Sequence, residues 1–311
     1  MLSLNDLKHK QILFIESERG CKNSIKFWNE NIRYVKDGVN INQMSCHNVL
    51  ATFVMGDMSL TTKLIEKCKN HGISIFLLKN NMDCYASILS SAEGNYELRR
   101  KQYTFRDDLK FSKHLVKNKI LNQSIGLKDP SWADNFLKTL ENAKTNKEIL
   151  GAEGSSSKDY FKKFFAGVDW KGRSPRTKRD ITNLLLDIGY SYLFNYIDCL
   201  LRLYGFDTYK GIYHKLFFQR RSLSCDIMEP FRVIIDKALL KAYHLNQIDQ
   251  SDFYLSNSCY RVKYKLSAKY SKIFVETIAS HREEIYEYVK KFYIYIMDST
   301  KKPPLFLLKK R

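Results

Sequence analysis

The 311-residue sequence has no long apolar run, and none approaches the roughly 18 residues of a membrane-spanning helix. A transmembrane helix is therefore excluded. The opening segment, MLSLNDLKHKQILF, also lacks the charged-then-apolar order of a signal peptide, and Asp6 argues against a transit peptide. We expect a protein that stays in the cytoplasm and makes no contact with membranes.

Glycine and proline are scarce, at 13 and 5 residues, which favours long helices joined by short connections. The seven cysteines are odd in number, form no C-x-x-C pair and have no zinc-finger spacing with histidine. We interpret them as small buried thiols in a reducing compartment. A disulfide framework and a structural zinc finger are therefore not expected.

Positive charge is abundant and unevenly distributed, with a formal net charge of +19. Residues 1–95 carry 11 Lys and Arg against 9 Asp and Glu, whereas residues 96–311 carry 41 against 24. Acidic lipids could bind such a surface, but the basic residues are spread widely and accompany no Trp-rich or strongly amphipathic anchor. The asymmetry therefore favours a nucleic-acid partner whose phosphates it neutralises.

The first ninety residues have mainly β character. The run QILFIES, the alternating residues around Ile25 and Phe27, and the apolar NVLATFVMG predict strands. Two further alternating segments flank Asp37-Gly38, a pair typical of a two-residue hairpin turn. One helix with a face through Leu64 and Cys68 is expected to end at Gly72, before the strand GISIFLL.

From Tyr96 onward helical periodicity dominates. One long pattern runs from Leu109 to Leu121 and another from Leu184 to Ile197, the second with Asp180 as its expected N-cap. The basic segment DWKGRSPRTKRD interrupts the helices, and SSAEGN is the expected linker. These features predict a β-rich domain at residues 1–93 and a helical domain at residues 94–311.

Three local patterns contain candidate chemical groups. Glu153 lies among small residues in GAEGSSSKDYF, which would let another backbone or a ligand come close. His214 lies in GIYHK, and Asp226 lies between apolar neighbours in SLSCDIMEPFR, where Pro230 predicts that a helix begins or bends. Each residue also has a simpler interpretation. Glu153 would be a solvated helix residue, His214 a hydrogen-bonded histidine, and Asp226 a helix cap or the partner of Arg232. Together, two carboxylates and one imidazole suit Mg²⁺ or Mn²⁺.

Several motifs in a fixed order resemble the CRISPR-associated spacer-acquisition integrase, the adaptation nuclease common to those systems. They are MGDMSLTTKLIEKCKNHGISIFLL, KNKILNQ, GAEGSSSKDYF, NLLLDIGYSYLFNYI, YGFDTYKGIYHK and SLSCDIMEPFR. The resemblance implies that Glu153, His214 and Asp226 bind the catalytic Mg²⁺ or Mn²⁺. Some relatives have a second Asp just before the last of these, but Leu223 occupies that area here, so no second carboxylate is assigned.

The resemblance also implies an α+β fold, with an N-terminal β-sandwich-like domain for dimerisation and an all-α catalytic domain. A homodimer, a complex with the small second CRISPR adaptation protein, and DNA as partner follow from the same resemblance. The implied activity is integration of short DNA fragments into a repeat array, through attack of a 3′-hydroxyl on a phosphodiester. The alternatives are a branched-DNA nuclease that does not integrate and a non-enzymatic nucleic-acid-binding scaffold.

Basic residues near the proposed ligands are the expected phosphate contacts, although an ordinary solvated surface is the alternative. They are Arg173, Arg176, Lys178, Arg179, Lys215, Arg220 and Arg221. The C-terminal KKPPLFLLKKR cannot continue a helix through its two prolines, and its apolar run would be sticky if left exposed. It is expected either to fold back onto its own domain or to dock on a partner.

Overall fold

The computed structural model describes residues 9–90, 94–106, 108–168, 170, 172–174 and 177–309. The chain divides into two compact units. The first contains Met1–Arg100 and Cys199–Asp207, and the second contains Lys101–Asp198 and Thr208–Arg311. The predicted division at residues 93 and 94 adjoins residues 91–93, outside the described part, and stays a prediction.

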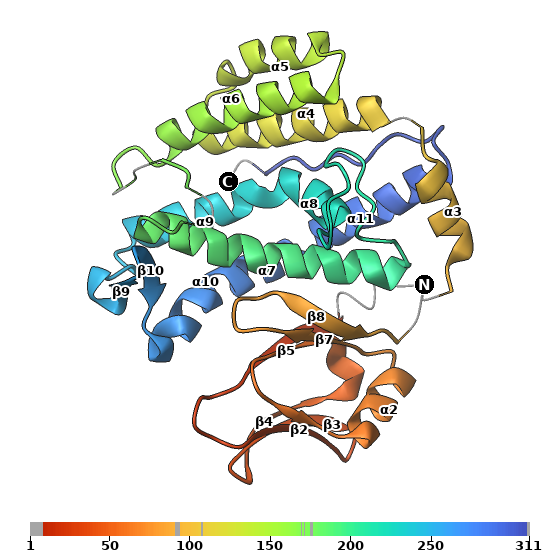
Figure 1. Cartoon of the computed structure of the whole chain (residues 1–311), viewed down its shortest axis with the longest axis vertical. Coiled ribbons are helices and arrows are strands. Elements are labelled where there is room, and N and C mark those ends of the chain that lie inside the picture. Colours follow the sequence, from red (N-terminus) through yellow and green to blue (C-terminus); the bar gives the residue numbers. More distant parts are fainter. Residues whose placement is uncertain are drawn as a thin grey trace. The chain divides into compact units, whose positions relative to one another are not determined.

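The first unit contains two four-stranded sheets that enclose a common apolar core (Figure 1). One sheet has the order β1, β5, β7, β8, with parallel pairing of β5 to both β1 and β7. The other has the order β4, β3, β2, β6. The strands are β1 (Gln11–Glu16), β2 (Asn23–Trp28), β3 (Asn31–Lys36), β4 (Val39–Ser45), β5 (Val49–Met55), β6 (Ser59–Leu60), β7 (Ser74–Leu78) and β8 (Cys84–Ile88).

The local signals of this unit are confirmed. Every residue of β5 is buried, as its continuous apolar run predicts. Asp37 and Gly38 both have positive φ and join β3 to β4 as a hairpin. The predicted helix is α2 (Thr62–Asn70), which Thr61 caps by accepting the backbone N–H of Leu64.

The described residues of the second unit are helical apart from turns, loops and one antiparallel pair, β9 (Phe253–Ser256) and β10 (Cys259–Val262). The predicted α+β class, a β-sandwich-like region followed by a helical one, is therefore confirmed. The helices are α3 (Tyr96–Thr104), which begins in the first unit, α4 (Asp108–Leu127), α5 (Trp132–Asn142), α6 (Asn146–Phe164), α7 (Ile181–Tyr204), α8 (Ser222–Met228), α9 (Arg232–His244), α10 (Ser267–Ser280) and α11 (Arg282–Met297).

Two helix boundaries have clear local causes. Asp180 caps α7 by accepting the backbone N–H of Asn183 at 2.6 Å, as predicted. Between α8 and α9 a short 3-10 turn, η2 (Glu229–Phe231), contains Pro230 and interrupts the α-helical hydrogen bonding. None of the described helices is long and apolar enough to cross a membrane.

The C-terminal segment folds back onto its own unit and lies in extended form against α4. Asn122 accepts the backbone N–H of Leu308 at 2.7 Å and donates to the carbonyl of Phe306 at 2.9 Å, and Asn118 makes an equivalent pair of bonds with Phe306. Phe306 and Leu308 are buried, whereas Leu305 and Leu307 are about half exposed. The side-chain amides of two asparagines of α4 thus satisfy backbone N–H and C=O groups of this segment, as a neighbouring β-strand would.

Candidate metal centre

Asp226 holds His214 in a fixed position. One carboxylate oxygen accepts the backbone N–H groups of Ile212 at 2.7 Å and Tyr213 at 3.0 Å. The other accepts the backbone N–H of His214 at 3.0 Å and lies 2.6 Å from Nδ1 of its ring. Because an ionised carboxylate only accepts, the proton lies on Nδ1, and the Nε2 lone pair is left for a metal or a proton.

Gly211 makes this arrangement possible. A Cβ at that position would lie 2.7 Å from the carbonyl oxygen of His214, 2.7 Å from Cβ of Ser222 and 3.0 Å from the Asp226 carboxylate. The first two distances are shorter than real Cβ contacts allow, and the third is tighter than most of them. The glycine in YGFDTYKGIYHK therefore lets the loop that carries His214 close over Asp226.

A second carboxylate faces Glu153 from the turn between α8 and α9. The buried ammonium of Lys119 contacts Glu153 and lies 2.7 Å from Glu229, whose carboxylate is also 3.0 Å from Nε of Arg232. Burial alone would lower the pKa of Lys119, but the two carboxylates outweigh it and raise that pKa. A positive charge is thus already held between Glu153 and Glu229.

Glu229 is strongly biased towards its ionised form. Burial acts to raise the pKa of this carboxyl, but Arg232, Lys119 and, more weakly, His214 lower it to about 2. Tyr213 makes a long hydrogen bond of 3.5 Å to Glu153, and burial followed by the charge of Glu153 raises the pKa of its phenol well above the usual value. The phenol therefore stays a hydrogen-bond donor.

Glu153 and Glu229 line one cavity of about 260 Å³. Its wall also contains Lys119, Arg173, Arg232 and Asp236. Asp236 accepts hydrogen bonds from Tyr160, at 3.0 Å, and from Tyr190, while burial raises its pKa to about 6. The cavity thus brings carboxylates and cations from α4, α6, α9 and the turn η2 to one place.

The donor set fits a hard divalent ion with one nitrogen ligand. Glu153 is only partly buried, His214 offers Nε2, and Glu229 faces Glu153 across Lys119. The four acceptor positions of Asp226 are filled by the three N–H groups and the imidazole, so this side chain suits the orientation of His214 better than metal binding. In the described part of the chain, these side chains do not form a group of three donors within 4.8 Å of one another.

Glu229 was not predicted from the sequence, although it lies in the same motif as Asp226. Its signal is the three-residue spacing from Asp226, which places both carboxylates on one helical face. The family resemblance points instead to a carboxylate before Asp226, where Leu223 is buried. Within the described chain nothing packs closely against the small residues beside Glu153, because a Cβ at Gly151 or Gly154 would meet nothing within 4 Å, so the predicted close approach of a ligand stays a prediction.

The candidate DNA contacts differ in their surroundings. Arg173 contacts Asp187 at 2.7 Å and Asn183 at 3.0 Å, and the buried Arg221 pairs with Asp198 at 3.5 Å. Arg179, Lys215 and Arg220 are exposed and Lys178 is half buried, whereas Arg176 lies outside the described residues. Between Lys215 and Arg220 the chain also exposes Phe217 and Phe218, by 73% and 84%, which sequence reasoning did not single out.

Comparisons with known proteins identify the family. The model of the family described as CRISPR associated protein Cas1 matches residues 20–279. A curated relative, the CRISPR-associated endonuclease Cas1 1 of Thermodesulfovibrio yellowstonii, is 32% identical over 63% of this chain and 70% of its own length. The CRISPR-associated endonuclease Cas1 3 of Thermus thermophilus is 27% identical over 64% of this chain and 64% of its own length.

Solved structures share the fold at lower sequence identity. A Cas1 protein from Thermotoga maritima, TM1797, has a TM-score of 0.81 at 18% identity, with 96% of this chain and 100% of that chain covered. A casposase bound to integration product has a TM-score of 0.80 at 20% identity, over 94% and 92% of the two chains. A chain of a Cas6-RT-Cas1--Cas2 complex has a TM-score of 0.75 at 20% identity, over 94% of this chain and 35% of that one.

The family match covers most of the sequence and includes all three of the motifs that supply Glu153, His214 and Asp226. The chain therefore belongs to the CRISPR-associated protein Cas1 family.

Proposed function

We propose that this protein is a divalent-metal-dependent DNA endonuclease and strand transferase that inserts short DNA fragments into a CRISPR repeat array. The observation that carries this proposal is the pairing of Glu153 with Glu229 around a buried cation, with His214, whose Nε2 is left available, near enough to lower the pKa of Glu229. Family membership and the endonuclease names of the curated relatives support it.

In the proposed reaction, the 3′-hydroxyl oxygen of a fragment attacks a repeat phosphodiester. The attacking hydroxyl loses its proton to solvent as the new P–O bond forms, the bond to the 3′ oxygen of the cut strand breaks, and that oxygen takes up a proton from solvent. Glu153, His214 and Glu229 would hold Mg²⁺ or Mn²⁺, with Asp226, the ligand predicted from sequence, orienting His214. The bound ion would supply electrostatic stabilisation to the phosphoryl oxygens in the transition state.

The protein's own residues prepare the site in two ways. Asp226 fixes the tautomer of His214, because the Nδ1 proton is held by its carboxylate. Lys119 and Arg232 keep Glu229 ionised, so no proton has to leave this carboxyl before it binds a cation. Both effects reduce the rearrangement that binding requires.

The proposed partners are DNA, a second copy of this chain and the small second CRISPR adaptation protein. The structurally similar Cas6-RT-Cas1--Cas2 complex and a Cas1–DNA complex (TM-score 0.56, 15% identity) support the DNA and adaptation-protein partners through shared fold alone. The excess of Lys and Arg in residues 96–311 supports DNA binding independently.

A strand-transfer assay tests the proposal. The protein is incubated with a labelled fragment and a repeat-containing duplex in Mg²⁺, in Mn²⁺ and in EDTA, and joined products are separated from cut products. We expect metal-dependent joining that Glu153→Ala and His214→Ala abolish while the fold is retained. Cutting of branched DNA without joining would instead support a nuclease, and metal-independent binding without either product would support a scaffold.

A further inference from the structure

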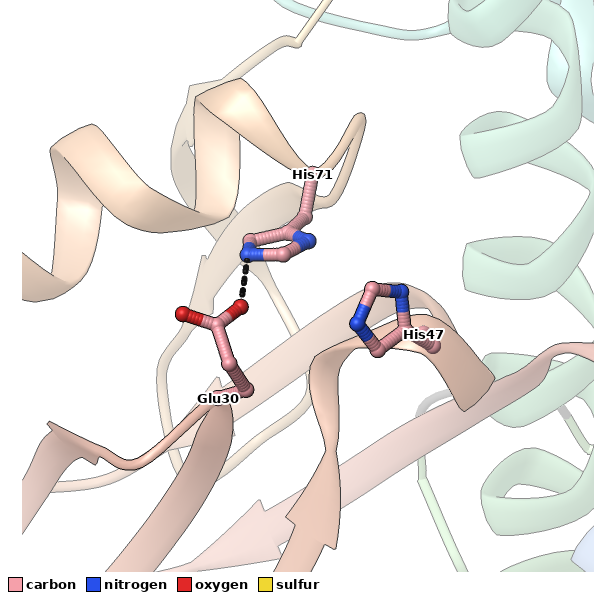
Figure 2. A group of neighbouring side chains, drawn as sticks. All are labelled: Glu30, His47 and His71. Atoms are coloured by element: carbon pink, nitrogen blue, oxygen red, sulfur yellow. Dashed lines mark ion pairs between the residues drawn. The ribbon is translucent and has the colours of Figure 1, made fainter.

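Three side chains of types that ligate metals lie close together in the first unit (Figure 2). Glu30, His47 and His71 each offer one ligand atom, and the three atoms lie within 4.8 Å of one another. Nε2 of His71 is 2.7 Å from the Glu30 carboxylate, and the rings of His47 and His71 meet edge to face with centroids 5.2 Å apart. All three side chains are exposed or half exposed, so an ion can reach them from solvent.

The three residues come from separate connections of the sandwich. Glu30 lies in the turn between β2 and β3, His47 in the 3-10 turn η1 (Cys46–Asn48) between β4 and β5, and His71 directly follows α2. Their proximity therefore cannot arise from local helical spacing. It depends on the tertiary structure of the unit.

The backbone beneath these side chains is firmly held. The carbonyl of Glu30 accepts the backbone N–H of Cys46 at 2.8 Å, which joins the β2–β3 turn to η1. The backbone N–H of His71 donates to Lys67 at 3.0 Å, and Ile73 N–H donates to Cys68 at 2.8 Å. Cys46, Cys68 and Ile73 are core residues, so the donors at the surface start from fixed positions.

Glu30 occupies an unusual backbone conformation for its residue type. Asn29 and Glu30 have φ values of 43° and 58°, and the second position of such a turn favours glycine. Glu30 lacks the conformational freedom of glycine at this position, and its carboxylate lies beside His71. The ring of Phe27, stacked on His71 with centroids 6.5 Å apart, restricts the imidazole from one side.

We propose that Glu30, His47 and His71 form a transition-metal site, for which Zn²⁺ is the best-matched ion, with water completing the coordination. Two imidazoles and one carboxylate are ligands that suit zinc, whereas Mg²⁺ prefers oxygen. On binding, Nε2 of His71 gives up its proton, which shifts to Nδ1 of a neutral ring or passes to solvent from a protonated one, and the ion takes its place between the two side chains. The ion would then link three connections of the β-sandwich.

The site is chemically distinct from the candidate catalytic centre. Its donors all lie in the first unit, whereas Glu153, His214 and Glu229 lie in the second, where carboxylates predominate. The inference therefore does not depend on the proposed DNA-processing function. It can be tested by metal binding and thermal stability without any substrate.

The experiment uses the full chain, freed of metal by chelation and then equilibrated with Zn²⁺. We expect His47→Ala, His71→Ala and the near-isosteric Glu30→Gln each to bind one Zn²⁺ fewer per chain than the wild type, or to bind it at least roughly tenfold more weakly. Zn²⁺ should raise the melting temperature of the wild type, and this rise should be lost in the variants. His9→Ala, which removes another exposed histidine of the same unit, is the matched control and should behave as the wild type.

Two outcomes would overturn the proposal. The first is that Glu30→Gln and His71→Ala have the same zinc stoichiometry and the same melting temperature as the wild type under the same conditions. The other is equal loss of zinc in His9→Ala, which would show unspecific binding by surface histidines. Should either alanine variant fail to fold, Glu30→Gln alone decides, because it removes the ligand charge while keeping the turn's shape.

Discussion

Asp226 and Glu229 are three positions apart in the sequence, yet their surroundings differ. Asp226 is completely buried and its acceptor positions are filled by three backbone N–H groups and the imidazole of His214. Glu229 faces Glu153 across Lys119 and lines the cavity that Asp226 does not reach. Mutations at the two positions should therefore have different consequences for metal binding.

We predict that Glu229→Gln weakens Mn²⁺ binding by more than about 100-fold, because the proposed direct ligand loses its charge. Asp226→Asn, if Asp226 orients His214 as proposed, should weaken Mn²⁺ binding by roughly 10- to 100-fold. Titration of Mn²⁺ into each folded variant measures both values, and melting curves control for the buried ion-pair network. If Glu229→Gln binds Mn²⁺ as tightly as the wild type, Asp226 rather than Glu229 is the metal ligand, as the sequence predicted.

Asp236 supplies a prediction about pH. Burial raises the pKa of this carboxyl to about 6, so the folded state binds its proton more tightly than the unfolded state does. The resulting stability is fully present below the unfolded pKa, near 4, and is lost as pH rises through about 6. Relative to Asp236→Asn, the wild type should lose up to about 3 kcal/mol of unfolding free energy between these values. Denaturant unfolding at several pH values measures this difference, and parallel curves for the two proteins would contradict it.

At the residue scale, the sequence predicted the roles that depend only on neighbouring residues. Asp180 follows a basic loop and precedes an apolar periodic run, which is enough to predict its capping role. The Lys119 ion pairs could not be predicted, because their partners Glu153 and Glu229 are 34 and 110 positions further along the chain.

At the scale of elements, the C-terminal segment depends on α4 for its backbone hydrogen bonds. We predict that Asn122→Leu lowers the unfolding free energy by about 2 kcal/mol or more, because the N–H of Leu308 and the carbonyl of Phe306 lose a buried partner. Lys309→Ala, which removes only an exposed ion pair with Glu284, should cost less than about 1 kcal/mol. Equal denaturation midpoints for Asn122→Leu and the wild type would show that this segment contributes nothing to stability.

The loop that follows His214 contains a second element-scale feature. Phe217 and Phe218 are largely exposed between the basic residues Lys215 and Arg220. Aromatic rings beside phosphate-binding cations are typical of surfaces that stack unpaired bases. We predict that replacing both phenylalanines by alanine lowers affinity for single-stranded DNA by roughly tenfold or more, at about 1–3 kcal/mol per stacked base. Replacing the exposed Leu245 and Leu255 by alanine is the control, and an equal effect there would exclude a specific role.

Elements were more predictable from the sequence than the contacts between them. The hairpin at Asp37-Gly38 and the apolar run of β5 have strong local signals, and both were predicted correctly. The parallel pairing of β5 with β1 and β7 was not, because strand order depends on long-range closure rather than on neighbouring residues. The path of the C-terminal segment stayed open between two alternatives for the same reason, since its partner is α4.

At the scale of the whole molecule, charge and chemistry are divided between the two parts of the chain. Residues 1–95 are close to electrically balanced, whereas residues 96–311 carry 41 Lys and Arg against 24 Asp and Glu. The candidate catalytic residues also lie in the second unit. A nucleic-acid surface is thus expected on the part that would perform the chemistry. The sequence alone could predict this division because charge counts need no tertiary structure.

The last prediction concerns the salt dependence of DNA binding. Each phosphate neutralised contributes about −0.9 to the slope of log affinity against log salt concentration in duplex DNA. Replacing Lys178, Arg179, Lys215 and Arg220 by glutamine removes four cations from the second unit and should flatten the measured slope by about one for each phosphate that is no longer neutralised. Replacing Lys22, Lys26, Lys63 and Lys69 by glutamine removes the same charge from the first unit and should leave the slope unchanged. Equal flattening of the slope in both variants would mean that DNA affinity depends on net charge rather than on a phosphate-binding surface of the second unit. An unchanged slope in both variants would mean that other residues form that surface.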